Sequence, residues 1–155
     1  MKILALDCAT VTGWAFAVDS KIVESGIKSF AKQRGESNGI LFMKFRKWLS
    51  DLIKAHQIDL VVFEKAHFRG GAATEIGVGL QTRVQEIASE NNIEYASYQA
   101  LNIKKRITGS GKASKDDMIA YATKVLNRPP IDDNEADAVS IAMLAIEDYN
   151  ITKEK

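Results

Sequence analysis

The sequence is poor in cysteine, with Cys8 alone, and it contains no long run of apolar residues. A single cysteine excludes an internal disulfide, which agrees with a reducing compartment. The lack of roughly 18–20 consecutive apolar residues excludes a membrane-spanning helix, and Asp7 interrupts the apolar start that a signal peptide would need. We therefore expect a cytoplasmic protein.

Histidine is also scarce, with two residues, and this limits catalysis by a thiol. A nucleophilic cysteine needs a histidine partner. His56 and His67 fall at the end of a predicted helix and in a predicted loop, with no recognisable spacing to Cys8. We interpret Cys8 as a small buried residue rather than a catalytic thiol.

The chain has little net charge, +1, but its charges are segregated along the sequence. Residues 101–115 hold five bases and no acid, whereas residues 131–137 hold four acids and no base. Such runs are often solvated surface, but here they also place an anion-binding surface beside a cation-binding one. An enzyme that uses a metal ion to act on a phosphodiester needs both surfaces.

Length and apolar spacing predict one α/β domain. We assign residues 1–150 to this domain and 151–155 to a C-terminal tail, because 155 residues leave no room for a second core. Apolar or alternating runs predict strands over 1–7, 12–19, 21–30, 58–64 and 92–98. Apolar residues at helical spacing predict helices over 38–56, 73–91, 115–126 and 134–149, with a flexible loop at 109–111.

The order of these elements predicts a mixed five-stranded sheet flanked by helices. Tight connections join the first three strands into an antiparallel meander, and the later strands, each separated by a helix, are parallel. Ser114 is expected to cap the helix over 115–126, with Asp117 at the third position as in a capping box.

Three acids lie near the carboxyl ends of the predicted parallel strands, where sheets of this kind bind ligands. Asp7 and Glu64 end apolar strands, and the carboxyl ends of parallel strands open into one crevice. Asp137 enters the last helix, where helical spacing puts Asp133 and Asn134 on its face and turns Glu135 elsewhere. These oxygen ligands suit Mg²⁺ or Mn²⁺, although acids at a helix start also simply complement its dipole.

Four blocks of sequence, taken in order, carry a resemblance to a known family. They are Leu6-Asp7-Cys8-Ala9-Thr10 with Gly13-Trp14, Val61-Val62-Phe63-Glu64, Tyr98 with the basic segment after it, and Asn134-Glu135-Ala136-Asp137-Ala138. Over almost the whole chain this set resembles the RuvC family of Holliday junction resolvases, in the ribonuclease H superfamily. The resemblance implies a ribonuclease H-like fold and an endonuclease that resolves four-way DNA junctions, and it leaves open whether forks and flaps are also cut.

The resemblance also implies which residues bind metal. Asp7, Glu64 and Asp137 match the metal-binding carboxylates of a site that holds two Mg²⁺ ions, with Mn²⁺ as a substitute. Asn134 stands where the family has another acid or a histidine. Its carbonyl oxygen can still coordinate a hard cation, and neighbouring Asp133 is the alternative ligand if the helix starts earlier.

Residues expected to contact DNA lie in two segments. Lys104 and Lys115 match basic positions that contact the scissile phosphate and the DNA backbone in the family, so Lys115 is also a candidate catalytic residue. The same acid-free run supplies Lys105, Arg106 and Lys112. After the Glu64 strand, Phe68, followed by Arg69, stands where the family carries an aromatic that probes unpaired bases, although a loop aromatic can equally pack on its own domain.

The helix over 73–91 resembles the dimer helix of the family, which implies a homodimer that presents two sites to a two-fold junction. The helix starts with small and apolar residues, namely Ala72, Ala73, Ile76, Val78 and Leu80. Packing of the helix against the chain's own sheet explains the same residues. The short chain resembles compact relatives carried by bacteriophages, which implies the host cytoplasm.

Two rival functions fit parts of the sequence. The sugar-kinase, actin and chaperone ATPases share this sheet, but Cys8-Ala9-Thr10 lacks the glycine of their phosphate turn, and they close two domains around the nucleotide. A junction-binding protein that has lost cleavage is the second rival, and Asn134 is the residue that favours it. It would bind branched DNA without cutting it.

Overall fold

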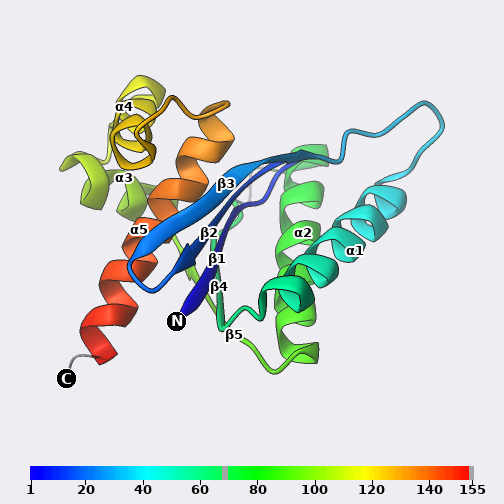
Figure 1. The fold of residues 1–155 in the computed structure, drawn as a ribbon. Coiled ribbons are helices and arrows are strands. Elements are labelled where there is room, and N and C mark those ends of the chain that lie inside the picture. Colours follow the sequence, from blue (N-terminus) through cyan, green and yellow to red (C-terminus); the bar gives the residue numbers. More distant parts are fainter. Residues whose placement is uncertain (68–69, 154–155) are drawn as a thin grey trace.

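A five-stranded mixed sheet forms the centre of the protein, for which the computed structural model describes residues 1–67 and 70–153 (Figure 1). The strands are β1 (Lys2–Asp7), β2 (Val11–Val18), β3 (Lys21–Ser29), β4 (Leu60–Glu64) and β5 (Glu94–Tyr98). Their order in the sheet is β3-β2-β1-β4-β5, with β1, β2 and β3 antiparallel and β1, β4 and β5 parallel. The predicted mixed sheet is confirmed.

Five helices are described around the sheet. They are α1 (Asn38–His56), α2 (Gly71–Glu90), α3 (Ala100–Thr108), α4 (Lys115–Leu126) and α5 (Asp133–Lys153). The predicted bounds of α1 and α4 are confirmed, including the capping box of Ser114 and Asp117. The sequence did not predict α3, because it has only nine residues and buries a single one, Ile103. Helix α5 also passes the predicted end at residue 149 and takes in the first residues assigned to a tail.

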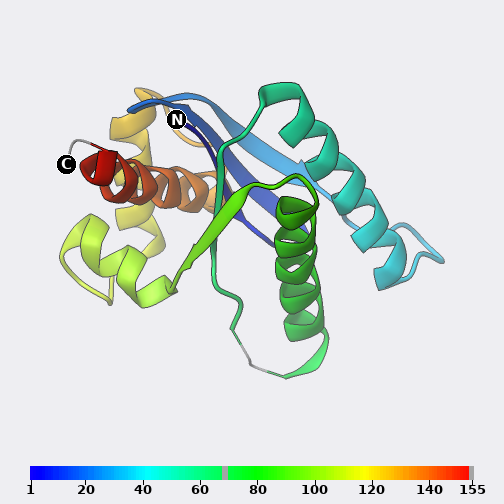
Figure 2. The same ribbon diagram turned by 90° about the horizontal axis from the view of Figure 1, so that it is seen from below.

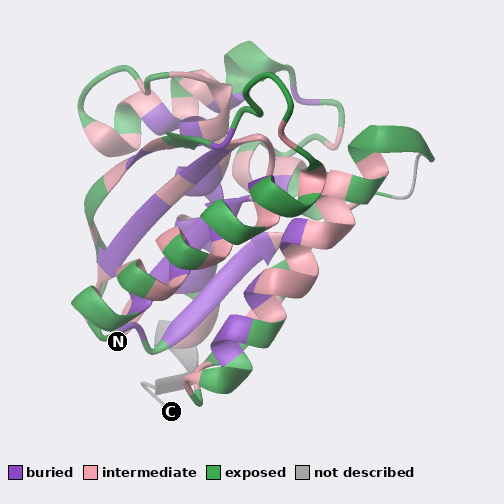
Figure 3. Cartoon of the chain, turned by 90° about the vertical axis from the view of Figure 1, so that its right-hand side faces the viewer, coloured by how far each residue is buried: buried purple, intermediate pink, exposed green. Residues whose placement is uncertain are grey.

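Alternate residues of each central strand face different helices. Ile3 and Ala5 of β1 join the core cluster that contains α5, whereas Leu4 and Leu6 join the cluster that contains α1 and α2. Figures 1 and 2 show the resulting three layers, with α1 and α2 on one face of the sheet and α3, α4 and α5 on the other. Figure 3 shows buried segments of the central strands and exposed outer surfaces on the helices.

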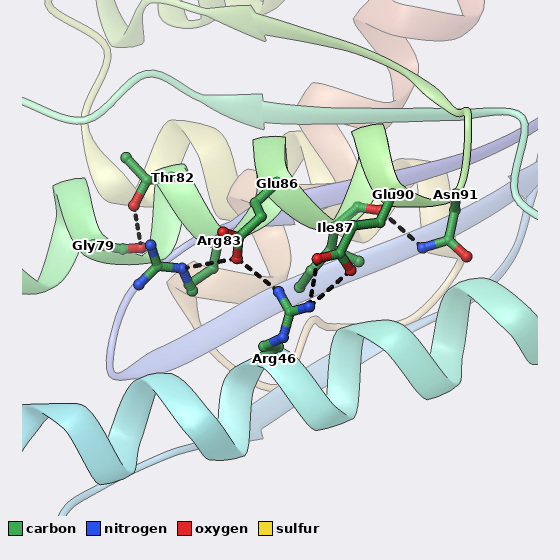
Figure 4. A network of polar contacts seen from close by, with 8 residues as sticks. All are labelled: Arg46, Gly79, Thr82, Arg83, Glu86, Ile87, Glu90 and Asn91. Atoms are coloured by element: carbon green, nitrogen blue, oxygen red, sulfur yellow. Dashed lines mark hydrogen bonds and ion pairs between the residues drawn. The ribbon is translucent and has the colours of Figure 1, made fainter.

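Helices α1 and α2 are tied together at their surface by ion pairs (Figure 4). The Arg46 guanidinium of α1 donates from Nη1 to Glu86 at 2.7 Å and from Nη2 to Glu90 at 2.6 Å, both on α2. Beside this network Phe42 lies so close to Gly79 that any Cβ there would overlap its ring. This close approach brings the two helices into one layer.

No helix in the described part of the chain is both long and apolar enough to cross a membrane.

Candidate active site

The alternation of strand residues sends Asp7 and Glu64 to the α5 side of the sheet. Asp7 follows Ala5 in the series that faces α5, and Glu64 follows Val62 in the same way. Because β1 and β4 are parallel neighbours, both carboxylates leave the sheet at one edge. Asp137, one turn into α5, meets them there, and its carboxyl is hydrogen-bonded to that of Asp7.

These carboxyls lie in an environment that disfavours their charge. Burial raises the pKa of Asp7, which is 9% exposed, and the charges of Asp137, Glu64 and Asp133 raise it further. Burial, followed by the charges of Glu64 and Asp133, raises the pKa of Asp137 to about 7, against the lowering effects of its hydrogen bond with Asp7 and of Lys104. Without a cation, the Asp7 and Asp137 pair therefore holds a proton up to near-neutral pH.

Asp133, rather than Asn134, brings a further carboxylate to this site. A pocket of about 230 Å³ is lined by Glu64, Asp133 and Asp137, and Asn134 is not among its described lining residues. The Asn134 side chain is turned aside, because its Nδ2 donates to Asp132 Oδ2 at 3.1 Å. Helix α5 starts at Asp133, one residue earlier than predicted, and this start brings Asp133 to the pocket.

Two predicted phosphate-binding lysines reach the same pocket. Lys104 comes from α3, and Lys115 is the first residue of α4. Lys115 Nζ lies 3.4 Å from Asp133 Oδ2, and the Lys115 side chain is 81% exposed. An anion that enters this pocket would thus meet two lysines and three acidic side chains.

The other predicted DNA contacts lie elsewhere. Lys105 and Lys112 are outside the residues that line the carboxylate pocket. Arg106 was predicted to face DNA, but its guanidinium binds both oxygens of Asp148 on α5, at 2.9 and 2.7 Å. It also lies over the ring of Tyr98, at 5.9 Å from the centroid, so it holds α3 against α5. Phe68 and Arg69 fall outside the described residues.

A second pocket, of about 290 Å³, adjoins the first at the same edge of the sheet. Glu64 and His67 line both pockets, and the second adds Asp7, Cys8 and the start of α2. The only sequence signal for His67 is its position three residues after the strand-ending Glu64. Cys8 is half-buried, and burial together with the charges of Asp7 and Glu64 raises the pKa of its thiol, so the thiolate is disfavoured.

Gly13 allows α5 to approach the end of β1. It is the register partner of Asp7 in β2, and any Cβ at this position would overlap the backbone carbonyl of Asn134. The turn between β1 and β2 is held by Thr12, whose hydroxyl donates to the Ala9 carbonyl at 2.7 Å. A residue larger than glycine would separate the helix that carries Asp137 from the strand that carries Asp7.

The donor set suits a hard cation, although it is not yet arranged around one. Within residues 1–67 and 70–153, no three His, Cys, Asp or Glu side chains already have the geometry of a metal site. Acids nevertheless gather at this edge of the sheet and raise the proton affinity of Asp7 and Asp137, which is the charge imbalance that a divalent cation relieves. The two carboxyls would have to part from their mutual hydrogen bond to act as ligands.

The apolar residues predicted to form a dimer face on α2 point in several directions. Leu80 is fully buried beneath the helix, and Ile76 packs against the same core. Ala73 lines the second pocket, while Ala72 is exposed. Packing on the chain's own sheet therefore accounts for Ile76 and Leu80, and these residues do not form one exposed surface.

Comparison with known proteins places the sequence among nucleases. The sequence model of the family "Crossover junction endodeoxyribonuclease RuvC" matches residues 17–145, which include Glu64 and Asp137. A protein of that name from Brachyspira hyodysenteriae is 35% identical over 79% of this chain and 76% of its own length. Another, from Prochlorococcus marinus, is 31% identical over 81% of this chain and 80% of its own.

Solved structures of the same name share the fold. Thermus thermophilus RuvC superposes with a TM-score of 0.81 at 16% identity, covering 98% of this chain and 97% of that one. The same protein solved in complex with a Holliday junction substrate gives 0.83, with 98% and 96% covered. At this level of identity the likeness establishes the arrangement of the elements, which includes the strand ends that carry Asp7 and Glu64.

Proposed function

Because the chain belongs to the crossover junction endodeoxyribonuclease RuvC family, we propose that it cuts four-way DNA junctions by metal-dependent hydrolysis of phosphodiester bonds. The observation that carries this proposal is the mutually hydrogen-bonded pair of Asp7 and Asp137, which burial and two further acids drive toward protonation. Lys104 and Lys115 line the same pocket as Asp137. This is the pairing of cation-binding and phosphate-binding groups that the reaction requires.

We propose that Asp7, Glu64, Asp137 and Asp133 hold two Mg²⁺ ions, for which Mn²⁺ substitutes. When bound, such ions supply a reactive water and neutralise the charge that develops on the departing oxygen. Asn134 is a weaker candidate ligand, because its side chain is bound to Asp132. Asp133 adds the negative charge that an amide lacks at this position.

The chain's own residues bind and orient the substrate around these acids. Lys104 and Lys115 hold the scissile phosphate against the carboxylates, and Lys115 exchanges its contact with Asp133 for the phosphate. Strand pairing fixes the backbone at both acids while the DNA enters, since Asp7 pairs with Gly13 of β2 and Glu64 with Tyr98 of β5. Water reaches these acids through the two pockets that adjoin them.

Further contacts extend along the DNA. We propose that Lys105 and Lys112 bind backbone phosphates outside the pocket, and that Phe68 and Arg69 contact bases at the junction centre. Arg106 is left out of this surface, because Asp148 holds its guanidinium. Forks and flaps share the branched geometry and are proposed as additional substrates.

A two-fold homodimer through α2, within the 73–91 range, would present two such sites to the two strands of a junction that are cut. Its contact surface would use the exposed and half-exposed side of α2, such as Ala72 and Val78, since Leu80 is buried. We propose that the protein acts in the cytoplasm, or in the host cytoplasm if a bacteriophage encodes it.

The test compares a labelled mobile four-way junction with a linear duplex, in Mg²⁺, in Mn²⁺ and in chelator. Wild-type protein should cut the junction and spare the duplex in either metal, and Asp7→Asn should bind the junction without cutting it. Junction binding with no cutting by the wild type in either metal would contradict the proposal. It would leave a non-cleaving DNA-binding relative, the alternative that Asn134 favours.

A further inference from the structure

Glu135 is a fully buried carboxylate that the proposed chemistry does not use. It lies in the first turn of α5, between Asp133 and Asp137, and its side chain is 0% exposed. A buried charge is costly unless hydrogen bonds and an opposite charge surround it. The contacts of this carboxylate therefore need an explanation.

The Glu135 carboxylate accepts hydrogen bonds from three residues, one on β3 and two in the loop before α5. Ser25 Oγ, on β3, donates to Oε2 at 2.7 Å. Arg128, in the loop before α5, donates from Nη2 to Oε2 at 2.8 Å and from Nη1 to Oε1 at 3.2 Å. The backbone N–H of Ile131 donates to Oε1 at 2.6 Å. Both carboxylate oxygens are thus held from outside the helix.

These bonds fix the start of α5 relative to the sheet. Ser25 anchors the helix to the third strand, and Arg128 and Ile131 anchor it to the loop that leads into it. Contact with Gly13 of β2 leaves no room for the helix to approach the sheet more closely. The first turn is therefore held at several points, and that turn carries Asp133, with Asp137 one turn later.

We propose that Glu135, Arg128 and Ser25 act as positioning residues that hold Asp133 and Asp137 where they can share a cation with Asp7 and Glu64. The inference rests on the proposed function, because it assigns the network a part in metal binding. Groups that orient metal ligands in this indirect way typically change metal affinity or activity about 10- to 100-fold when they are removed.

The test uses Ser25→Ala, which removes one hydrogen bond, Arg128→Met, which removes the ion pair, and Ser25→Thr, which keeps the hydroxyl. Mn²⁺ binding to the protein alone is measured by electron paramagnetic resonance, and junction cleavage is measured as kcat and KM. Ser25→Ala and Arg128→Met should weaken Mn²⁺ binding and lower kcat about 10- to 100-fold with KM unchanged. Ser25→Thr should retain both.

Arg46→Met is the matched control, because it removes an arginine with two glutamate contacts from the α1–α2 layer (Figure 4). It should leave Mn²⁺ affinity and kcat unchanged. A merely structural network would lower the thermal midpoint of Ser25→Ala and Arg128→Met while Mn²⁺ affinity and kcat stayed at the wild-type values below it. That result, or an equal loss in Arg46→Met, would overturn the proposal.

A wild-type protein that neither binds Mn²⁺ nor cuts DNA would contradict the proposed function instead. Positioning is then decided in the metal-free protein by amide hydrogen exchange over residues 131–138. Ser25→Ala and Arg128→Met should accelerate exchange there several-fold relative to Arg46→Met. Unchanged exchange in this segment would overturn the positioning role independently of the nuclease activity.

Discussion

The two faces of the sheet are built from the same strands but differ in what they bury. The α1–α2 face is an apolar layer in which Phe45 and Leu49 are fully buried, and its ion pairs lie at the surface. The α5 face buries charge, with Glu135 in a complete network and Asp7 among other acids. The α5 face has an apolar core as well, but it also buries carboxylates, which is costly unless hydrogen bonds or a cation compensate their charge.

Replacing Asp137 should have the largest effect and should move activity and stability in opposite directions. Asp137→Asn removes a proposed metal ligand, so cleavage should fall at least about 100-fold, beyond the typical cost of an indirect contact. It also removes a repelled charge, so the metal-free protein should be more stable at pH 8. Single-turnover cleavage and thermal unfolding in chelator measure the two effects, and a loss of both would contradict the assignment.

Leu49→Ala probes the opposite face. Leu49 is 0% exposed in the α1–α2 core, and truncation of such a side chain costs about 2–5 kcal/mol of the free energy of unfolding. Cleavage below the unfolding transition should keep the wild-type kcat, because the carboxylates lie across the sheet. Denaturant unfolding gives the stability change. A parallel loss of kcat at a temperature where the variant is folded would show that the faces are coupled.

The pH dependence of the free energy of unfolding should reflect the acids buried on the α5 face. Because the pKa of Asp137 is raised to about 7, the folded metal-free protein holds a proton that the unfolded chain releases near pH 4. Stability in chelator should therefore be highest near pH 5 and fall as the pH rises to 8. On α5, Glu135 and Asp148 are carboxylates with lowered pKa, and they lose their stabilising effect only at more acidic pH.

Mg²⁺ should flatten this profile, because a cation replaces the shared proton, and Asp137→Asn in chelator should flatten it as well. Thermal unfolding from pH 5 to 8 measures both profiles. A metal-free wild type whose stability rises between pH 5 and 8 would show the opposite sign and would contradict a raised pKa at Asp137.

The smallest expected effects concern the bases. Lys112→Ala should weaken junction binding and reduce the slope of log affinity against log salt by about 1, the value for one lost phosphate contact. Arg106→Met should leave that slope unchanged and lower stability modestly, because its guanidinium is bound to Asp148. Binding titrations at several salt concentrations distinguish them. An equal change of slope in both variants would show that Arg106 also contacts a DNA phosphate.

The strand ends and the long helix were predictable because their signals are local. Apolar runs end at Asp7 and at Glu64. Because side chains alternate between the two faces of a strand, the position of each acid sets the face to which its carboxylate points. The helical spacing of apolar residues in α1 continues long enough to define both ends of the helix, and Ser37 caps its N-terminus. Asp137 followed from its place at the entrance to an apolar helix.

The remaining assignments depended on partners that are distant in sequence. Helix α3 is stabilised by packing on α4 and α5, with one buried residue of its own. Arg106 and Asp148 are 42 residues apart, and Glu135 and Ser25 are 110 apart, so neither pairing has a local signal.

The sequence by itself therefore determined which strands end in a carboxylate and which family the chain resembles. Only the tertiary structure decided that Asp133 rather than Asn134 reaches the pocket and that Arg106 and Glu135 hold helices in place. The physical reason is that periodicity reports which face of an element is apolar. The partner of a charged side chain is chosen by the packing of elements that the sequence separates.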